Sequence, residues 1–143
     1  FYAVKNINFT VNDGEIVGFL GRNGAGKSTT MNMITGFIEP TEGEILVGGY
    51  DIDLYPKKVK AQIGYMPEGT PLYYDLTVKE FVTYMAELKR IPKANRKEAV
   101  KEAIARTGLE VVQNNLTKNL SRGYKQRVSM AGAIVGNPKI LIE

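Results

Sequence analysis

Hydrophobic and polar residues follow one another along this chain in patterns that predict short strands early and longer helices later. Residues 2–11 alternate between apolar and polar types and predict a strand, which ends at the turn of residues 12–14. Short runs of mostly apolar residues, bounded by glycine or proline, predict further strands at 15–20, 44–47, 63–67 and 140–142. We therefore expect several short strands that are separated by turns.

Helices are predicted in four other stretches, from apolar residues at helical spacing and from capping residues. Thr77-Val78-Lys79-Glu80 has the form of a capping box, in which a threonine and a glutamate satisfy backbone N–H groups reciprocally. Ser121 is a second candidate N-cap, and the helix that begins there is expected to end before Pro138. The predicted helices cover residues 28–35, 78–88, 94–106 and 121–137.

The loop between the strand at 15–20 and the helix at 28–35 has the residues of a phosphate-binding loop. The pattern G-x-x-x-x-G-K-[ST] is fitted at every fixed position by Gly21-Arg22-Asn23-Gly24-Ala25-Gly26-Lys27-Ser28-Thr29. Glycines let the backbone curl with no Cβ to keep a phosphate away, so successive N–H groups point inward at the positive end of the helix. Lys27 can reach the β- and γ-phosphates, and the Ser28 hydroxyl can ligate Mg²⁺.

The alternative for this loop is a glycine-rich turn that binds nothing. The Lys27-Ser28 pair and the order of strand, loop and helix argue against that alternative. The sequence therefore predicts a site for a nucleoside triphosphate with Mg²⁺.

The amino-acid composition excludes several kinds of site and partner. The chain has no cysteine and no histidine, which excludes disulfides, thiolate metal sites and imidazole catalysis within these 143 residues. Its net charge is +4, and the lysines and arginines have no interleaved aromatic residues, so we expect a solvated face and no nucleic-acid partner. No apolar run is long enough to span a bilayer, so any link to a membrane is expected through a partner. Because the chain begins at Phe1 and ends at Glu143 after an apolar run, we expect a piece of a longer protein.

Three segments that follow the phosphate loop in order resemble motifs of the ATP-binding cassette (ABC) ATPases. Ile63-Gly64-Tyr65-Met66-Pro67-Glu68 is similar to the Q-loop of that family. Leu120-Ser121-Arg122-Gly123-Tyr124-Lys125-Gln126-Arg127 resembles its signature motif. Asn137-Pro138-Lys139-Ile140-Leu141-Ile142 is similar to the approach to its Walker B strand. The resemblance extends over the whole chain.

This resemblance implies an α/β fold with a P-loop NTPase-type core, an antiparallel β edge and a helical insert. The whole chain would be part of one ABC ATPase domain. About 1–70 and 121–143 would form the nucleotide-binding core, and about 71–120 the helical subdomain. Full-length members of the family hydrolyse ATP, and the variant signature resembles that of the ABC-2-type exporter ATPases.

The same resemblance implies partners and a place in the cell. Two ABC ATPase domains pair head to tail and hold ATP between the phosphate loop of one domain and the signature motif of the other. Ser121, Arg122 and Gly123 would thus face the ATP of the second domain. The helical insert would contact a membrane-spanning permease subunit, which would place the protein on the cytoplasmic face of the cell membrane.

Two positions depart from the family pattern, and one residue is ambiguous. Glu68 replaces the Q-loop glutamine, and its carboxylate would still ligate Mg²⁺ or orient water. Arg122 replaces the first signature glycine, and Tyr124 replaces the usual glutamine. Glu143 falls at the last apolar position of the Walker B strand. It would serve as the catalytic glutamate only if intervening residues are missing.

Two other functions stay open at this point. A soluble ABC protein that acts on ribosomes or DNA usually has a second cassette or a long coiled-coil insertion, and neither is visible in 143 residues. Another P-loop enzyme, a GTPase or a small-molecule kinase, is the third possibility. The chain has no Asn-Lys-x-Asp motif for guanine, and a kinase would leave residues 120–127 unexplained. The resemblance therefore favours an ATPase subunit of a membrane transporter.

Overall fold

A computed structural model describes residues 1–69, 73 and 75–143, which form helices and short strands. The chain forms two units, Phe1–Lys60 and Ala61–Glu143. The start of the helical insert, predicted near residue 71, lies outside the described residues. Among the described residues, no helix is long and apolar enough to cross a membrane.

The first unit holds helix α1 (Lys27–Ile34), a hairpin of strands β1 (Leu46–Val47) and β2 (Tyr50–Asp51), and the first turn of α2 (Pro56–Gln62). The hairpin is antiparallel, with Val47 opposite Tyr50, and its first strand lies within the strand predicted at 44–47. Its turn consists of Gly48 and Gly49, which both have positive φ, as a tight hairpin requires. Helix α2 is not predicted by the sequence pattern, because its lysines are typical of a solvated run, although Val59 among them is buried.

The strands predicted at 2–11 and 15–20 are wrong as strands. Neither segment is paired with a strand among the residues that the structure describes, and both are without regular secondary structure. Ile16, Val17 and Leu20 are exposed, so the apolar pattern is present but is not buried. A strand forms only when a neighbouring segment accepts and donates its backbone hydrogen bonds, and alternation alone does not provide that neighbour.

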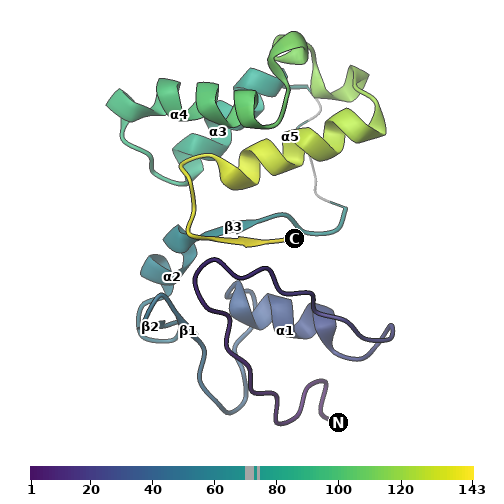
Figure 1. The fold of residues 1–143 in the computed structure, drawn as a ribbon, viewed down its shortest axis with the longest axis vertical. Coiled ribbons are helices and arrows are strands. Elements are labelled where there is room, and N and C mark those ends of the chain that lie inside the picture. The colour runs from purple at the N-terminus through teal and green to yellow at the C-terminus, as the bar shows by residue number, and fades with distance from the viewer. Residues whose placement is uncertain (70–72, 74) are drawn as a thin grey trace. The chain divides into compact units, whose positions relative to one another are not determined.

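In the described part of the second unit there are three α-helices, two short 3₁₀ helices and a parallel strand pair. Its elements in chain order are β3 (Ile63–Tyr65), α3 (Val78–Leu88), α4 (Lys93–Arg106), the 3₁₀ helices η1 (Glu110–Val112) and η2 (Thr117–Asn119), α5 (Arg122–Ile134) and β4 (Ile140–Ile142). Figure 1 shows β3 and β4 side by side, and their register pairs Ile63 with Ile140 and Tyr65 with Ile142. Both strands were predicted from the sequence.

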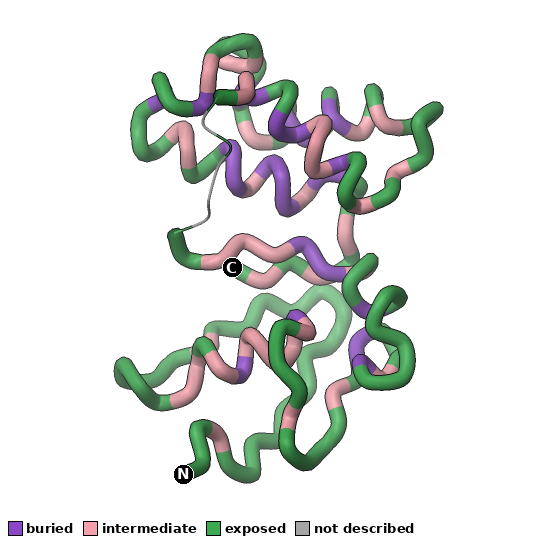
Figure 2. Tube along the Cα trace, turned by 180° about the vertical axis from the view of Figure 1, so that it is seen from behind, coloured by how far each residue is buried: buried purple, intermediate pink, exposed green. Residues whose placement is uncertain are grey.

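The core of this unit lies where α3, α4 and α5 face one another, and the tube in Figure 2 shows buried residues on all three. Valine, leucine, isoleucine, alanine and one phenylalanine make up this core: Val78, Phe81, Val82, Ala86, Val100, Ala103, Ile104, Leu109, Leu120, Val128, Ala131 and Val135. Their burial stabilises the three helices as one bundle, since packing of an apolar face outweighs helix propensity.

Both predicted N-caps are confirmed. Thr77 Oγ1 accepts a hydrogen bond from the Glu80 amide at 3.1 Å, and Glu80 Oε2 accepts one from the Thr77 amide at 2.8 Å. Ser121 Oγ accepts from the Tyr124 amide at 3.3 Å. These caps start α3 and α5 at the residues that the sequence indicated.

Lys89 stabilises the opposite end of α5. Its ammonium donates to the carbonyls of Ala133 and Val135, the second at 3.1 Å. Carbonyls at the C-terminal end of a helix have no backbone N–H donor within the helix, so this lysine satisfies them. Burial lowers the pKa of Lys89 from its ordinary 10.5 to about 8. The folded protein therefore releases this proton at a lower pH than the unfolded chain does.

We expect the free energy of unfolding to rise with pH between about 8 and 10.5 through Lys89. In that range the unfolded chain binds the proton that the folded chain has lost, so the linkage slope is positive, and below pH 8 both states are protonated. Urea denaturation of wild type and Lys89→Met over this range should give a difference that increases with pH. Lys97→Met, at an exposed lysine of α4, is the control, and the same pH dependence in all three proteins would contradict the assignment.

Candidate functional site

The phosphate loop ends where α1 begins, and the backbone there is shaped for an anion. Gly26 is the N-cap with φ 95°, and Gly24 has φ 81°, a region that other residues rarely adopt. No side chain caps the helix, and the first amides of a helix have no acceptor within it. These N–H groups are therefore available to bind a phosphate.

The space around the two glycines differs. A Cβ on Gly26 would lie 2.6 Å from the Ala3 carbonyl oxygen and 2.8 Å from Val4 Cγ2, so the N-terminal segment packs directly on the loop. A Cβ on Gly24 would meet no atom within 4 Å. One side of the loop is thus closed by the chain, while the side at Gly24 is open to a ligand.

Lys27 places a positive charge over this loop. Its ammonium donates to the carbonyls of Gly21 and Arg22, the second at 2.8 Å, so the side chain bends back across the loop from the first residue of α1. The Ala25 amide closes the turn onto the Arg22 carbonyl at 3.1 Å. The predicted residues Gly21, Arg22, Asn23, Gly24, Ala25, Gly26, Lys27, Ser28 and Thr29 are therefore brought together in one loop and the first turn of α1.

The residues present also fit Mg²⁺ at Ser28. Ser28 is exposed in the first turn of α1, next to the open amides. Among the described residues, no group of three or more carboxylate, imidazole or thiol side chains forms a complete metal cage. Magnesium does not require one, because it keeps several water molecules and takes phosphate oxygens together with one or two protein ligands.

Glu68 and Glu143 follow two neighbouring strands of the second unit. β3 ends at Tyr65 and β4 at Ile142, which are paired in register, and the Met66 amide donates to the Ile142 carbonyl at 2.9 Å. Both carboxylates are exposed just beyond these carboxyl ends. The parallel pairing thus brings Glu68 and Glu143 to the same edge of the strand pair.

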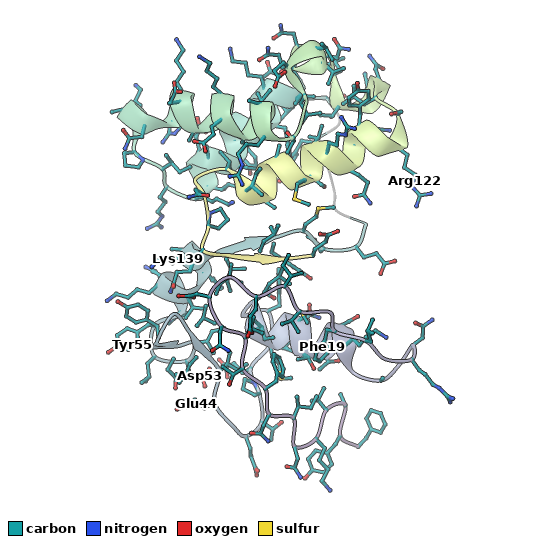
Figure 3. The ribbon with its side chains drawn as sticks, viewed as in Figure 1. Phe19, Glu44, Asp53, Tyr55, Arg122 and Lys139 are labelled. Atoms are coloured by element: carbon teal, nitrogen blue, oxygen red, sulfur yellow. The ribbon has the colours of Figure 1, made fainter. Side chains whose placement is uncertain are left out.

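The signature residues lie at the N-terminus of α5. Ser121 caps the helix, and Arg122 and Gly123 are exposed in its first turn. A Cβ on Gly123 would meet nothing within 4 Å, and Figure 3 shows Arg122 extending away from the three helices. The Arg127 guanidinium lies over the Tyr124 ring, 5.4 Å from its centroid, which holds the following turn. Ser121, Arg122 and Gly123 are therefore presented together to the outside of this unit.

Sequence reasoning missed one buried polar residue near this site. Thr117, four residues before Ser121, is fully buried, and its hydroxyl donates to the Tyr73 carbonyl at 2.9 Å. The only signal in the sequence is a polar residue in an otherwise ordinary connection, which does not reveal a partner 44 positions away.

Comparison with known proteins agrees with the motifs. The family model described as ABC transporter matches residues 4–143. Relatives include the lipopolysaccharide export system ATP-binding protein LptB of Haemophilus influenzae, 37% identical over 98% of this chain and 59% of its own length. The methionine import ATP-binding protein MetN 2 of Enterococcus faecalis is 40% identical over 98% of this chain and 42% of its own.

Solved structures support the same conclusion. The dimeric post-hydrolysis state of the ATP-binding cassette MJ0796 bound to ADP and Pi is similar with a TM-score of 0.80 and 31% identity. That similarity covers 98% of this chain and 64% of that structure. The chain thus spans less than two thirds of these proteins. It belongs to the ABC transporter family and has the mixed α/β P-loop fold of its ATP-binding cassettes.

Proposed function

We propose that this chain is the nucleotide-binding part of an ATPase subunit that powers a membrane transporter. The observation that carries the proposal is the loop at α1, where Lys27 lies over a backbone turn and the first helical amides lack acceptors within the helix. A triphosphate supplies the negative charge and the oxygen acceptors that this arrangement lacks. We divide the chain into a nucleotide-binding core, about 1–70 and 121–143, and a helical subdomain, about 71–120. The loop at α1 belongs to the core.

Each predicted site residue has a role in this proposal. Gly21 to Gly26 wrap the phosphates, Lys27 reaches the β- and γ-phosphates, and Ser28 ligates Mg²⁺, with Glu68 as a second ligand or as the group that orients water. Bound Mg²⁺ supplies positive charge against the phosphate oxygens. Glu143, which follows β4 at the same edge of the strand pair as Glu68, is a second candidate for orienting water.

A second copy of the domain completes the site. We assign Ser121, Arg122 and Gly123 to the ATP that is bound by the phosphate loop of the partner copy. Their exposure at the N-terminus of α5 supports this arrangement, because the hydroxyl, the amides and the Arg122 charge all suit a phosphate. The dimeric state of the MJ0796 cassette also supports it.

A permease subunit is the third partner. The second unit has a groove of about 520 Å³ along α4, which is lined by apolar residues such as Ile91 and Ile134 and by polar ones such as Glu98. A groove with both apolar and polar lining suits a short amphipathic helix of a partner protein. We propose that the membrane-spanning subunit docks on this helical part, which would place the protein on the cytoplasmic face of the membrane. Export is the direction that the variant signature, with Arg122 and Tyr124, supports.

Replacing Lys27 tests the proposed function. We expect Lys27→Ala to weaken Mg-ATP binding at least about tenfold, roughly 1.4 kcal/mol, because the phosphate charge then loses its nearest cation. Calorimetric titration would measure the affinity. Lys57→Ala, at an exposed lysine of the same unit, removes the same charge and should bind ATP as wild type does. Equal affinities of Lys27→Ala and wild type would refute the proposal.

A further inference from the structure

Two segments of the second unit are joined by a row of hydrogen bonds. One consists of residues 73 and 75–79, which follow Glu68 along the chain, and the other of residues 113–120, which lead to Ser121. The backbone bonds are Val78 N to Asn115 O at 3.1 Å, Lys79 N to Gln113 O at 2.9 Å and Thr117 N to Leu76 O at 2.9 Å. An ion pair between Lys118 and Asp75, at 3.7 Å, lies beside them. These bonds join the described residues of the two segments at several points.

Thr117 adds a side-chain hydrogen bond to this row. It is fully buried, and its Oγ1 donates to the Tyr73 carbonyl at 2.9 Å while its amide donates to the Leu76 carbonyl. A buried hydroxyl or carbonyl without a partner costs free energy, so the bond fixes the position of both groups. Through one residue, the segment before Ser121 is attached at two points to the segment after Glu68.

From Thr117 the chain leads to Ser121 with little freedom. Residues Thr117–Asn119 form η2, whose end is closed by the Leu120 amide bonding to the Thr117 carbonyl at 3.2 Å. Leu120 is part of the helical core. Ser121 follows and caps α5. The position of the Ser121 hydroxyl therefore depends on where Thr117 is held.

We propose that Thr117 is a positioning residue, which holds Ser121 in place for the partner's nucleotide through its hydrogen bond to Tyr73. This inference rests on the proposed function and deepens it. Thr117 touches no substrate. Its hydroxyl links the signature residues to the segment that follows Glu68. The site for the partner's nucleotide therefore forms only when the hydrogen bonds between the two segments are in place.

The test separates positioning from simple packing by using variants of similar size. Thr117→Val keeps the β-branched shape and removes the hydroxyl, whereas Thr117→Ser keeps the hydroxyl. Thr107→Val is the matched control, because Thr107 Oγ1 also donates to a backbone carbonyl, that of Ala103 at 2.8 Å, but at the end of α4. If Thr117→Val does not fold, Thr117→Ala, which also lacks the hydroxyl, takes its place.

Two affinities are measured on the full-length protein that contains this chain. Calorimetry gives the affinity of the monomer for Mg-ATP, and sedimentation with saturating ATP gives the dissociation constant of the dimer. For Thr117→Val we expect an unchanged monomer affinity and a dimer about tenfold weaker, because Ser121 is then held less firmly in the position that the partner's nucleotide requires. Thr117→Ser should restore dimerisation to within about threefold of wild type. Thr107→Val should dimerise as wild type does.

Three results would overturn the inference. Dimerisation of Thr117→Val equal to wild type would show that the hydroxyl is not needed. An equal loss in Thr107→Val would show that general destabilisation is the cause. If wild type binds ATP but does not dimerise with it, the partner arrangement of the proposed function fails, and the role of Thr117 fails with it.

Discussion

We expect Ser121→Arg to abolish ATP-driven dimerisation of the full-length protein, by at least about a hundredfold in the dimer dissociation constant, while the monomer binds Mg-ATP as before. Ser121 is exposed at the start of α5, in the part of the second unit that we assign to the partner's nucleotide. An arginine there is too large for a site that accommodates a hydroxyl, and it removes the cap on the Tyr124 amide. The phosphate loop lies in the other unit and keeps its own residues.

Loss of the N-cap is a competing explanation for weaker dimerisation of Ser121→Arg. Two further variants that keep the cap test this explanation. Ser121→Asp retains an N-cap acceptor but adds a carboxylate opposite phosphate, so it should also prevent dimerisation. Ser121→Thr keeps both the cap and the hydroxyl and should dimerise. Sedimentation with Mg-ATP, alongside calorimetry on each monomer, measures both quantities. A dimer in Ser121→Arg as strong as that of wild type would mean that α5 does not face the partner's ATP.

The features that the sequence predicted well are those whose signals act within one or two turns. The capping box at Thr77 and the cap at Ser121 place the start of α3 and α5, because each cap bonds to an amide only three residues away. The phosphate loop was likewise readable, since its glycines and Lys27 contact one another within six positions. These elements can be predicted because the contacts that define them join residues close together in the sequence.

The strands show what a local sequence pattern does not determine. Residues 63–67 and 140–142 were expected as strands, and they pair across the chain as β3 and β4. Residues 15–20 have an equally apolar pattern and are not paired among the described residues. The difference lies in the neighbouring segment and not in the pattern, because a ladder needs donors and acceptors from a second strand.

Contacts over long sequence separations were also invisible. Lys89 bonds to the Ala133 carbonyl 44 positions away, and Thr117 bonds to the Tyr73 carbonyl at the same separation. Lysine and threonine are residue types that are mostly exposed in folded proteins, so nothing in the sequence indicated that either side chain is buried. Such contacts depend on how the helices pack, which the apolar pattern of each helix alone does not specify.

The second large effect is expected at Gly64, in the middle of β3. A Cβ built there would lie 2.3 Å from the Ala133 carbonyl oxygen and 2.8 Å from Pro138 Cγ. Neither neighbour is the end of a flexible side chain: one is the backbone near the end of α5, and the other is a ring that enters β4. The missing Cβ of Gly64 is thus what lets α5 pack directly on β3.

Gly64→Ala should therefore lower the free energy of unfolding by about 3 kcal/mol, at the upper end of what overpacking costs, because the strand or the helix must shift to relieve the overlap. Urea denaturation measures the loss. Gly18→Ala is the matched control, since a Cβ at Gly18 meets nothing within 4 Å, and its effect should stay within about 0.5 kcal/mol. Because α5 also carries Ser121, a displaced helix should weaken the dimer as well. Equal urea midpoints for the two variants would show that α5 and β3 do not approach each other this closely.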